Sequence, residues 1–238
     1  MVLQQFCGCL ALVGPEVDAL AHEVGTHDYS FVPTTSLYHI TLVTKEELRS
    51  LKSSSSPQDI LPKLQNALGN EHPRLHSLGL GGQLRLRPEV YFVVVIWAKG
   101  QQLRKLLGLA PKHFHITLSL RDAHDVEKGV TSLLHPFPAD VSVELLDHLV
   151  FTLYSMGDYE HAKGCATKLY RSFSSSEKGF LRLGDSALKL AEYKPAMLSY
   201  ACGHRRATDP NVQEYCIRAA PRRRNGVPSV QSGSSSNY

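Results

Sequence analysis

The tetrapeptide His-Ile-Thr-Leu occurs at residues 39–42 and again at residues 115–118. Both copies lie in segments that are typical of a β-strand, in which successive side chains point to opposite faces. In each strand the histidine and the threonine therefore share one face, while the isoleucine and the leucine share the other. If the two strands lie side by side, two imidazoles and two hydroxyls meet on one surface. Such a set of groups is suited to acid–base chemistry on a phosphate.

The composition is ordinary for a globular protein. The chain has 238 residues, of which 42% are hydrophobic and 20% are charged, and its formal net charge is +4. This length allows one large domain or two small ones. Part of the positive charge lies in Arg222, Arg223 and Arg224 near the C-terminus. The rest of the chain is therefore closer to neutral, and its composition does not indicate an extensive nucleic-acid-binding surface.

The cysteines indicate a reducing compartment, and the apolar runs indicate no membrane segment. The five cysteines include no second pair at metal-ligand spacing, so we expect reduced thiols without a disulfide framework. Cys7 and Cys9 are expected to share a face of a strand over residues 6–13. The first 14 residues lack the pattern of a signal peptide, and Val90–Ala98, the longest apolar run, is shorter than the ~20 residues of a membrane span. We expect a cytoplasmic or nuclear protein with no membrane segment.

Residues 1–138 alternate between predicted strands and predicted helices, which indicates an α+β domain. Thr44 and Glu47 form a capping-box pattern, so a helix is expected directly after the first motif strand. Gly81 and Gly82 predict a hairpin turn. The other predicted elements are helices over 15–24, 60–68, 100–109 and 124–134 and strands over 37–43, 75–80, 83–87, 90–97 and 113–119. The two halves have similar layouts, which suggests an internal duplication.

From residue 139 onward the pattern is helical and repeats at an offset of 34 residues. Tyr159 corresponds to Tyr193, and Ala162 corresponds to Ala196. A helix–turn–helix unit of this length, with small residues at these points, resembles the tetratricopeptide repeat. The resemblance implies an array that binds a protein partner. An ordinary pair of helical hairpins is the alternative interpretation.

With its two His-x-Thr motifs, the first part of the chain resembles the 2H phosphoesterase superfamily. Members of that superfamily carry two His-x-Ser/Thr motifs, each followed by an apolar residue, and they include RNA 2′,3′-cyclic phosphodiesterases. The resemblance implies a two-lobed, pseudo-symmetric fold over residues 1–138. Residues 139–220 then form the tetratricopeptide-like array, and residues 221–238, which are rich in serine and glycine, are expected to be a disordered tail.

The resemblance implies a metal-independent phosphodiesterase without a cofactor, which opens the 2′,3′-cyclic phosphate of an RNA end or a nucleotide to a 2′-phosphate. His39 and His115 are the expected acid and base, because free imidazole titrates at about pH 6.5. Thr41 and Thr117 are expected to donate hydrogen bonds to the non-bridging phosphate oxygens. We take His115 as the base and His39 as the acid, although the near symmetry of the motifs allows the reverse.

Further side chains are candidates for contacts with the substrate. Tyr91 is able to stack on a base. Arg85, Arg87 and Lys112 are able to pair with phosphates. Trp97 and Tyr38 are further candidates for stacking, although aromatic residues on apolar strands more often belong to a core.

Three alternatives remain open at the level of the sequence. A zinc site built from His39, His113 and His115 has a known ligand spacing but no obvious fourth ligand. The domain could instead bind RNA or nucleotide ends without turnover, as part of an interaction protein. It could also hydrolyse another phosphodiester, such as a 2′-5′ oligoadenylate or an ADP-ribose derivative.

Overall fold

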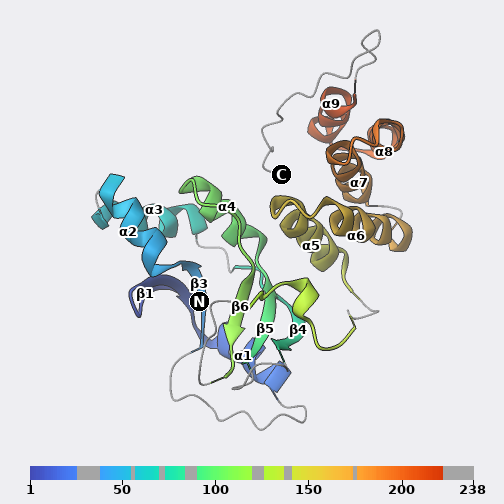
Figure 1. Cartoon of the computed structure of the whole chain (residues 1–238). Coiled ribbons are helices and arrows are strands. Elements are labelled where there is room, and N and C mark those ends of the chain that lie inside the picture. The colour runs from blue at the N-terminus through green and yellow to red at the C-terminus, as the bar shows by residue number, and fades with distance from the viewer. Residues whose placement is uncertain are drawn as a thin grey trace. The chain divides into compact units, whose positions relative to one another are not determined.

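The computed structural model describes residues 1–25, 38–54, 57–69, 73–83, 90–119, 126–136, 141–173 and 176–221 (Figure 1). The chain divides into two compact units, Met1–Val141 and Ser142–Tyr238. The first unit combines strands and helices, and the described part of the second is helical. The predicted order of an α+β region followed by an all-α region is therefore confirmed. None of the described helices has the length and apolar character to cross a membrane.

The first unit is built on two antiparallel sheets of three strands each, and each sheet ends in one of the motif strands. In the first sheet β2 pairs with both β1 and β3, and in the second β5 pairs with both β4 and β6. The strands are β1 (Val2–Phe6), β2 (Cys9–Val13), β3 (His39–Val43), β4 (His76–Gln83), β5 (Val90–Ile96) and β6 (Phe114–Thr117). The two motif segments thus occupy equivalent places, which agrees with a pseudo-symmetric fold.

The strand predicted over residues 6–13 is wrong in one respect, because a tight turn divides it. Cys7 and Gly8 both have positive φ angles, of 48° and 83°, and Phe6 pairs directly with Cys9. A two-residue hairpin loop of type I′ requires positive φ angles at both of its central residues. Cys7 therefore lies in the turn and is exposed, while Cys9 lies on β2, so the two thiols do not share a strand face.

The hairpin turn predicted at Gly81 and Gly82 is also wrong, because β4 continues through both residues. Gly81 pairs with Phe92 on β5. A Cβ atom at Gly81 would lie 2.4 Å from the Phe92 ring, and one at Gly82 would lie 2.9 Å from the carbonyl oxygen of Val90. These glycines therefore allow β4 and β5 to approach closely.

The helices of the first unit follow the sequence pattern closely until residue 119. Thr44 and Glu47 form the predicted capping box: the Thr44 amide donates to Glu47 Oε2 at 2.9 Å, and the Glu47 amide donates to Thr44 Oγ1 at 3.3 Å. The helix predicted over 124–134 is wrong for its described part, which contains a single 3₁₀ turn. The helices are α1 (Pro15–Gly25), α2 (Lys45–Ser54), α3 (Pro57–Leu68), α4 (Ala98–Leu106) and the 3₁₀ helix Val130–Ser132.

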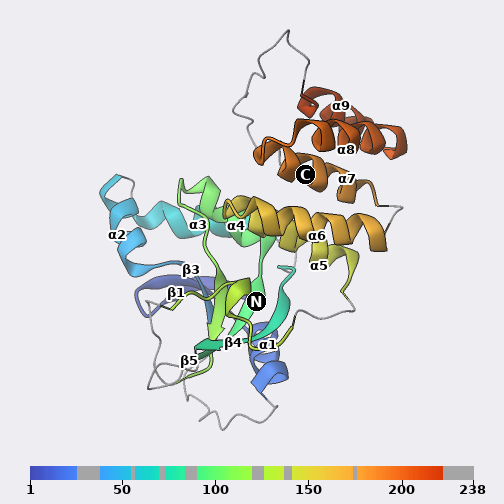
Figure 2. The same cartoon turned by 45° about the vertical axis from the view of Figure 1, so that its right-hand side comes forward.

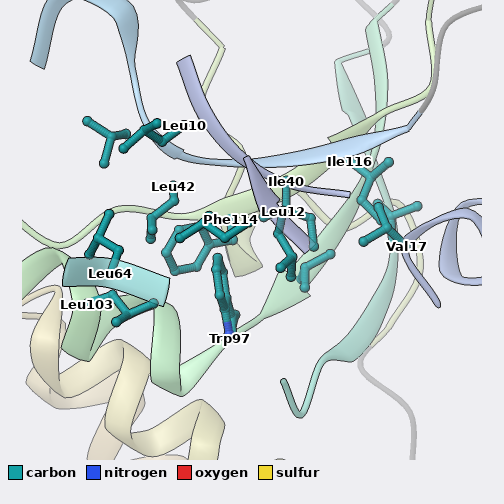
Figure 3. Packing of buried hydrophobic residues seen from close by; sticks show 14 of the residues in the cluster. Leu10, Leu12, Val17, Ile40, Leu42, Leu64, Trp97, Leu103, Phe114 and Ile116 are labelled. Atoms are coloured by element: carbon teal, nitrogen blue, oxygen red, sulfur yellow. The ribbon is translucent and has the colours of Figure 1, made fainter. Parts of the chain in front are cut away.

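A continuous hydrophobic core joins the two sheets to the helices of the first unit (Figure 3). Trp97, at the end of β5, is fully buried, and its ring lies 5.1 Å from that of Phe114 on β6. Leu64 of α3 and Leu103 of α4 belong to the same cluster, so both helices contribute to the core that holds the sheets. Trp97 is therefore a core residue and not a platform for a base.

The second unit is a succession of antiparallel helices, each packed on the next (Figure 2). Both helices of the second pair begin and end 34 residues after their counterparts in the first pair. Ala162 on α6 and Ala196 on α8 are fully buried, as close helix packing requires. The helices are α5 (Val143–Ser155), α6 (Tyr159–Ser172), α7 (Glu177–Lys189), α8 (Tyr193–Arg206) and α9 (Pro210–Ala219).

Two carboxylates, a buried one at Asp147 and a half-buried one at Asp185, connect the helices of the second unit. Asp147 on α5 accepts hydrogen bonds from Arg182 Nε at 2.8 Å and Lys178 Nζ at 3.2 Å, both on α7. Burial alone would raise the pKa of Asp147, but the positive charge of Arg182 holds this pKa below its usual value. Asp185 accepts from the hydroxyls of Tyr200 and Tyr215, each at 2.7 Å. These bonds link α7 to α8 and α9.

Candidate active site

The two motif strands lie next to each other in the first unit (Figure 1). β3 ends the first sheet and β6 ends the second, and no described ladder pairs one with the other. The contact between β3 and β6 therefore depends on side chains. Ile40 and Leu42 from β3 enter the same hydrophobic cluster as Ile116 and Leu118 from the second motif.

Burial along the motif strands alternates as predicted. Ile40 and Ile116 are fully buried, whereas His39, Thr41, His115 and Thr117 are all half-buried. Because adjacent side chains on a strand point to opposite faces, both His-Thr pairs point away from the core that the two strands share. Two neighbouring strands thus leave four polar side chains on the faces opposite their common core.

Each motif histidine packs against a phenylalanine of its own sheet. The ring centroid of His39 lies 4.7 Å from that of Phe6, with the planes at 43°. The centroid of His115 lies 6.0 Å from that of Phe92, in an edge-to-face contact. Nδ1 of His115 is buried, so the accessible part of this half-buried ring lies elsewhere on it. Packing of this kind restricts the orientation of an imidazole.

Lys112 lies shortly before the second motif strand, and Gln101 of α4 binds its backbone. Gln101 Nε2 donates to the carbonyl oxygen of Lys112 at 2.6 Å, and the Lys112 amide donates to Gln101 Oε1 at 3.3 Å. Burial, together with the nearby charge of Arg104, lowers the pKa of the Lys112 amine. A half-buried amine with neighbouring positive charges is a reasonable partner for an anion, so Lys112 stays a candidate for phosphate binding.

Tyr91, a predicted contact residue, does not lie on the histidine-bearing face of its sheet. Tyr91 is adjacent to Phe92 on β5, and Phe92 pairs with Thr117. Tyr91 therefore points to the opposite face of the sheet, where it packs against the core. Its backbone carbonyl accepts a hydrogen bond from the Leu118 amide at 2.9 Å. Arg85 and Arg87 lie outside the described residues.

His113 precedes β6 and lies beside Glu127 and Gly129. Its Nε2 lies 3.9 Å from Glu127 Oε1, and a Cβ atom at Gly129 would lie 2.7 Å from its ring. Among the described residues, His39, His113 and His115 do not form a group whose ligand atoms all lie within 4.8 Å of one another. The zinc alternative therefore lacks the ligand geometry that it needs.

Arg104 on α4 is a polar group that the sequence analysis did not single out. The residue is 1% exposed, yet the hydrogen-bond partners of its side chain lie outside α4. Glu47 is the acidic partner of this guanidinium. Burial alone would raise the pKa of Glu47, but the hydrogen bonds from Arg104 and from the Thr44 backbone hold this pKa below its usual value.

The comparison with protein families agrees with the geometry of the motif strands. Residues 8–125 match the family described as Swiss Army Knife, 2H phosphoesterase domain. This match supports a 2H phosphoesterase domain. The matched residues contain both His-x-Thr motifs and the five strands from β2 to β6. Neither the curated proteins nor the solved structures contain a significant match.

The match supports a phosphoesterase activity in general and suggests a nucleotide or RNA substrate. The helices after residue 142 lie outside the matched range.

Proposed function

We propose that the first unit is a metal-independent phosphodiesterase that hydrolyses 2′,3′-cyclic phosphates of RNA ends or nucleotides by two-histidine acid–base catalysis. The observation that carries the proposal is the placement of β3 and β6: they are neighbours, their apolar residues enter one core, and both His-Thr pairs lie opposite that core. The 2H phosphoesterase match over residues 8–125 supports the same chemistry.

In the proposed reaction, one imidazole accepts a proton from water while the water oxygen attacks phosphorus. The bond from phosphorus to the 3′ oxygen breaks, and the other histidine, as imidazolium, donates its proton to that oxygen. The products are a 2′-phosphate and a free 3′ hydroxyl. The two histidines end with their protonation states exchanged, and solvent restores them. Each role contributes roughly 10²–10⁴-fold to the rate.

The hydroxyls of Thr41 and Thr117 donate hydrogen bonds to the non-bridging oxygens in this proposal. Negative charge grows on these oxygens as water attacks, so donors that are already oriented stabilise the transition state more than the ground state. His115 is the proposed base and His39 the proposed acid. The burial of Nδ1 in His115 favours Nε2 as the nitrogen that meets the substrate.

The helical unit is proposed to be a short tetratricopeptide-like array that binds a protein partner. Three observations support it: the 34-residue offset of the helix bounds, the buried Ala162 and Ala196, and the backbone of Gly157 and Ala191. These last two residues precede α6 and α8 at equivalent points, and both have positive φ angles, of 82° and 59°. We also propose a cytoplasmic or nuclear location, because the small, odd number of cysteines in the sequence indicates reduced thiols.

The experiment that tests the proposed activity uses the purified full chain. It is incubated with 2′,3′-cyclic AMP and with an RNA that ends in a cyclic phosphate, with and without a chelator, and the phosphate isomer of the product is identified. We expect a 2′-phosphate in both buffers and loss of turnover in His39→Ala and His115→Ala.

Other outcomes favour the alternatives. Tight binding of an intact cyclic phosphate without product supports an interaction protein. Turnover that requires added zinc supports a metal site. Cleavage of a 2′-5′ oligoadenylate or an ADP-ribose derivative, with the cyclic phosphates left intact, supports a different phosphodiester substrate.

A further inference from the structure

Arg104 binds a backbone group of the first motif strand and a backbone group of the segment that precedes the second. Nη1 donates to the carbonyl oxygen of Leu42 at 2.6 Å, and Leu42 is the last residue of the first His-Ile-Thr-Leu motif. Nε donates to the carbonyl oxygen of Ala110 at 2.7 Å, in the segment that leads into β6. One guanidinium therefore connects the end of one motif strand to the approach to the other.

Glu47 completes this connection from the helix that follows β3. Its two carboxylate oxygens accept from Arg104, Oε1 from Nη2 at 2.6 Å and Oε2 from Nη1 at 3.0 Å. Oε2 also accepts from the Thr44 amide at 2.9 Å. A two-pronged pair of this kind fixes the plane of the guanidinium as well as its distance. The end of β3 is thus held at the Leu42 carbonyl and at the Thr44 amide.

Such a cluster is costly to bury, which makes its position informative. Arginine keeps its charge at any ordinary pH, and an ion pair removed from water is often no more stable than well-packed apolar residues. Arg104 is 1% exposed and Glu47 is half-buried. Stability alone is therefore a weak explanation for placing this pair between β3 and the segment that leads into β6.

The arrangement of the sheets supplies a stronger explanation. No described ladder joins β3 to β6, so backbone pairing does not set the separation or the register of the two motifs. Apolar packing brings the strands together but is not directional. Hydrogen bonds from one rigid fork to the Leu42 and Ala110 carbonyls are directional. They hold the end of β3 beside the segment that leads into β6.

We propose that Arg104, oriented by Glu47, is a positioning residue that sets the distance between the two motif histidines. The inference rests on the proposed two-histidine reaction, in which both imidazoles must reach one phosphorus. Arg104 does not touch the substrate in this scheme. It acts through the Leu42 and Ala110 carbonyls, and Gln101 supports it by holding Lys112 two residues further toward β6.

The test compares Arg104→Lys with Arg182→Lys in the full chain. Lysine keeps the charge at residue 104 but cannot reach both carbonyls and both oxygens of Glu47. Arg182→Lys is the matched control, because Arg182 also pairs with a buried carboxylate, Asp147, but in the second unit. Glu47→Gln is the second variant, which keeps an oxygen for the Thr44 amide and removes the charge beside Arg104.

We expect Arg104→Lys to lower kcat by about 10²-fold, because a displacement of about 1 Å between reacting groups has an effect of this size. KM should change little, and the optimum of the pH profile should shift. Glu47→Gln should change kcat in the same direction by less, and Arg182→Lys should match the original chain. The NMR signals of the His39 and His115 rings should move in Arg104→Lys and stay in place in Arg182→Lys.

The two readouts separate the two proposals. If the original chain does not hydrolyse a cyclic phosphate, the proposed function fails, and the ring signals still decide whether Arg104 positions the histidines. If Arg104→Lys is folded but keeps kcat, pH profile and both ring signals, Arg104 does not position them. If Arg104→Lys does not fold, the same criteria apply to Glu47→Gln, and unchanged kinetics and ring signals there overturn the proposal.

Discussion

Both units of this protein repeat a piece of their own sequence, but the repeated residues are of different kinds. In the first unit the copies are His39 with Thr41 and His115 with Thr117, and all four side chains are half-buried. In the second unit the copies include Ala162 and Ala196, and both are fully buried.

This difference separates a repeat that folding explains from one that it does not. A small buried residue at the same point of successive helices lets them pack closely, so the structure itself requires it. Imidazole and hydroxyl groups that face away from a core contribute little to that core. We therefore interpret the first repeat as chemical and the second as structural, and each interpretation predicts different effects of substitution.

The largest expected effect tests whether two histidines with identical neighbours perform opposite roles. His39→Ala and His115→Ala should each lower kcat by roughly 10²–10⁴-fold, because each removes one proton-transfer group. The residual activity of His115→Ala should lose the acidic limb of the bell-shaped pH profile, since the base is missing, and that of His39→Ala should lose the alkaline limb. Steady-state kinetics from pH 5 to 9 measures both.

If His115→Ala instead loses the alkaline limb and His39→Ala loses the acidic limb, the two histidines have the opposite roles and the proposed reaction still holds. A profile of the original chain that is flat over this range would contradict paired imidazoles. Unfolding followed by the fluorescence of Trp97, which lies in the core of the first unit and is the single tryptophan of the sequence, provides the control for stability.

The next effect concerns the threonines of the same repeat. Thr41→Val and Thr117→Val remove a hydroxyl with almost no change in shape, and we expect kcat to fall by about 10²-fold for each if the hydroxyls bind the transition state. Thr167→Val on α6 is the matched control, since its hydroxyl donates to the Lys163 carbonyl at 2.9 Å within its own helix. Equal kcat values for all three variants and the original chain would show that the threonines serve packing alone.

Local sequence patterns predicted those features that depend on near neighbours. The capping box at Thr44 and Glu47 formed with both of its hydrogen bonds, and the alternation in both motif strands matches their burial. The turn at Cys7 and Gly8 was missed because the flanking apolar residues read as a single strand.

Features that depend on distant partners could not be predicted in the same way. In the sequence Gly81 is typical of a turn, and its close contact with Phe92 on the neighbouring strand is visible only in the structure. Arg104 stands at the end of an amphipathic helix, where an arginine usually faces solvent. Its partners Leu42 and Glu47 are 62 and 57 residues away in sequence. The sequence showed the two motifs, but it did not show what holds their strands.

The structural repeat predicts an effect on stability. Ala196→Leu places a larger side chain at a fully buried position of α8 and should lower the free energy of unfolding of the second unit by about 1–3 kcal/mol. Ala201→Leu, on the exposed face of the same helix, is the control and should change it by less than about 0.5 kcal/mol. Urea unfolding followed by helical circular dichroism measures both. Equal midpoints for the two variants would contradict close packing at Ala196.

The smallest expected effect comes from the turns that open the second helix of each pair. Gly157 and Ala191 occupy equivalent points and both have positive φ angles, of 82° and 59°. An L-residue with a side chain is strained there, while glycine is not, although glycine also gives the unfolded chain more freedom. Gly157→Ala should therefore lower the free energy of unfolding, and Ala191→Gly should raise it, each by about 0.5–1 kcal/mol.

The opposite signs make this pair a sharp test of the 34-residue repeat. If the two turns are structural copies, the double variant Gly157→Ala with Ala191→Gly exchanges the two residues and should have nearly the stability of the original chain, because the two changes cancel. Urea unfolding of the two single variants and the double variant measures all three values. If both single variants shift stability in the same direction, the two turns respond differently to a side chain. The equivalence of the helix pairs would then be limited to their lengths and their buried alanines.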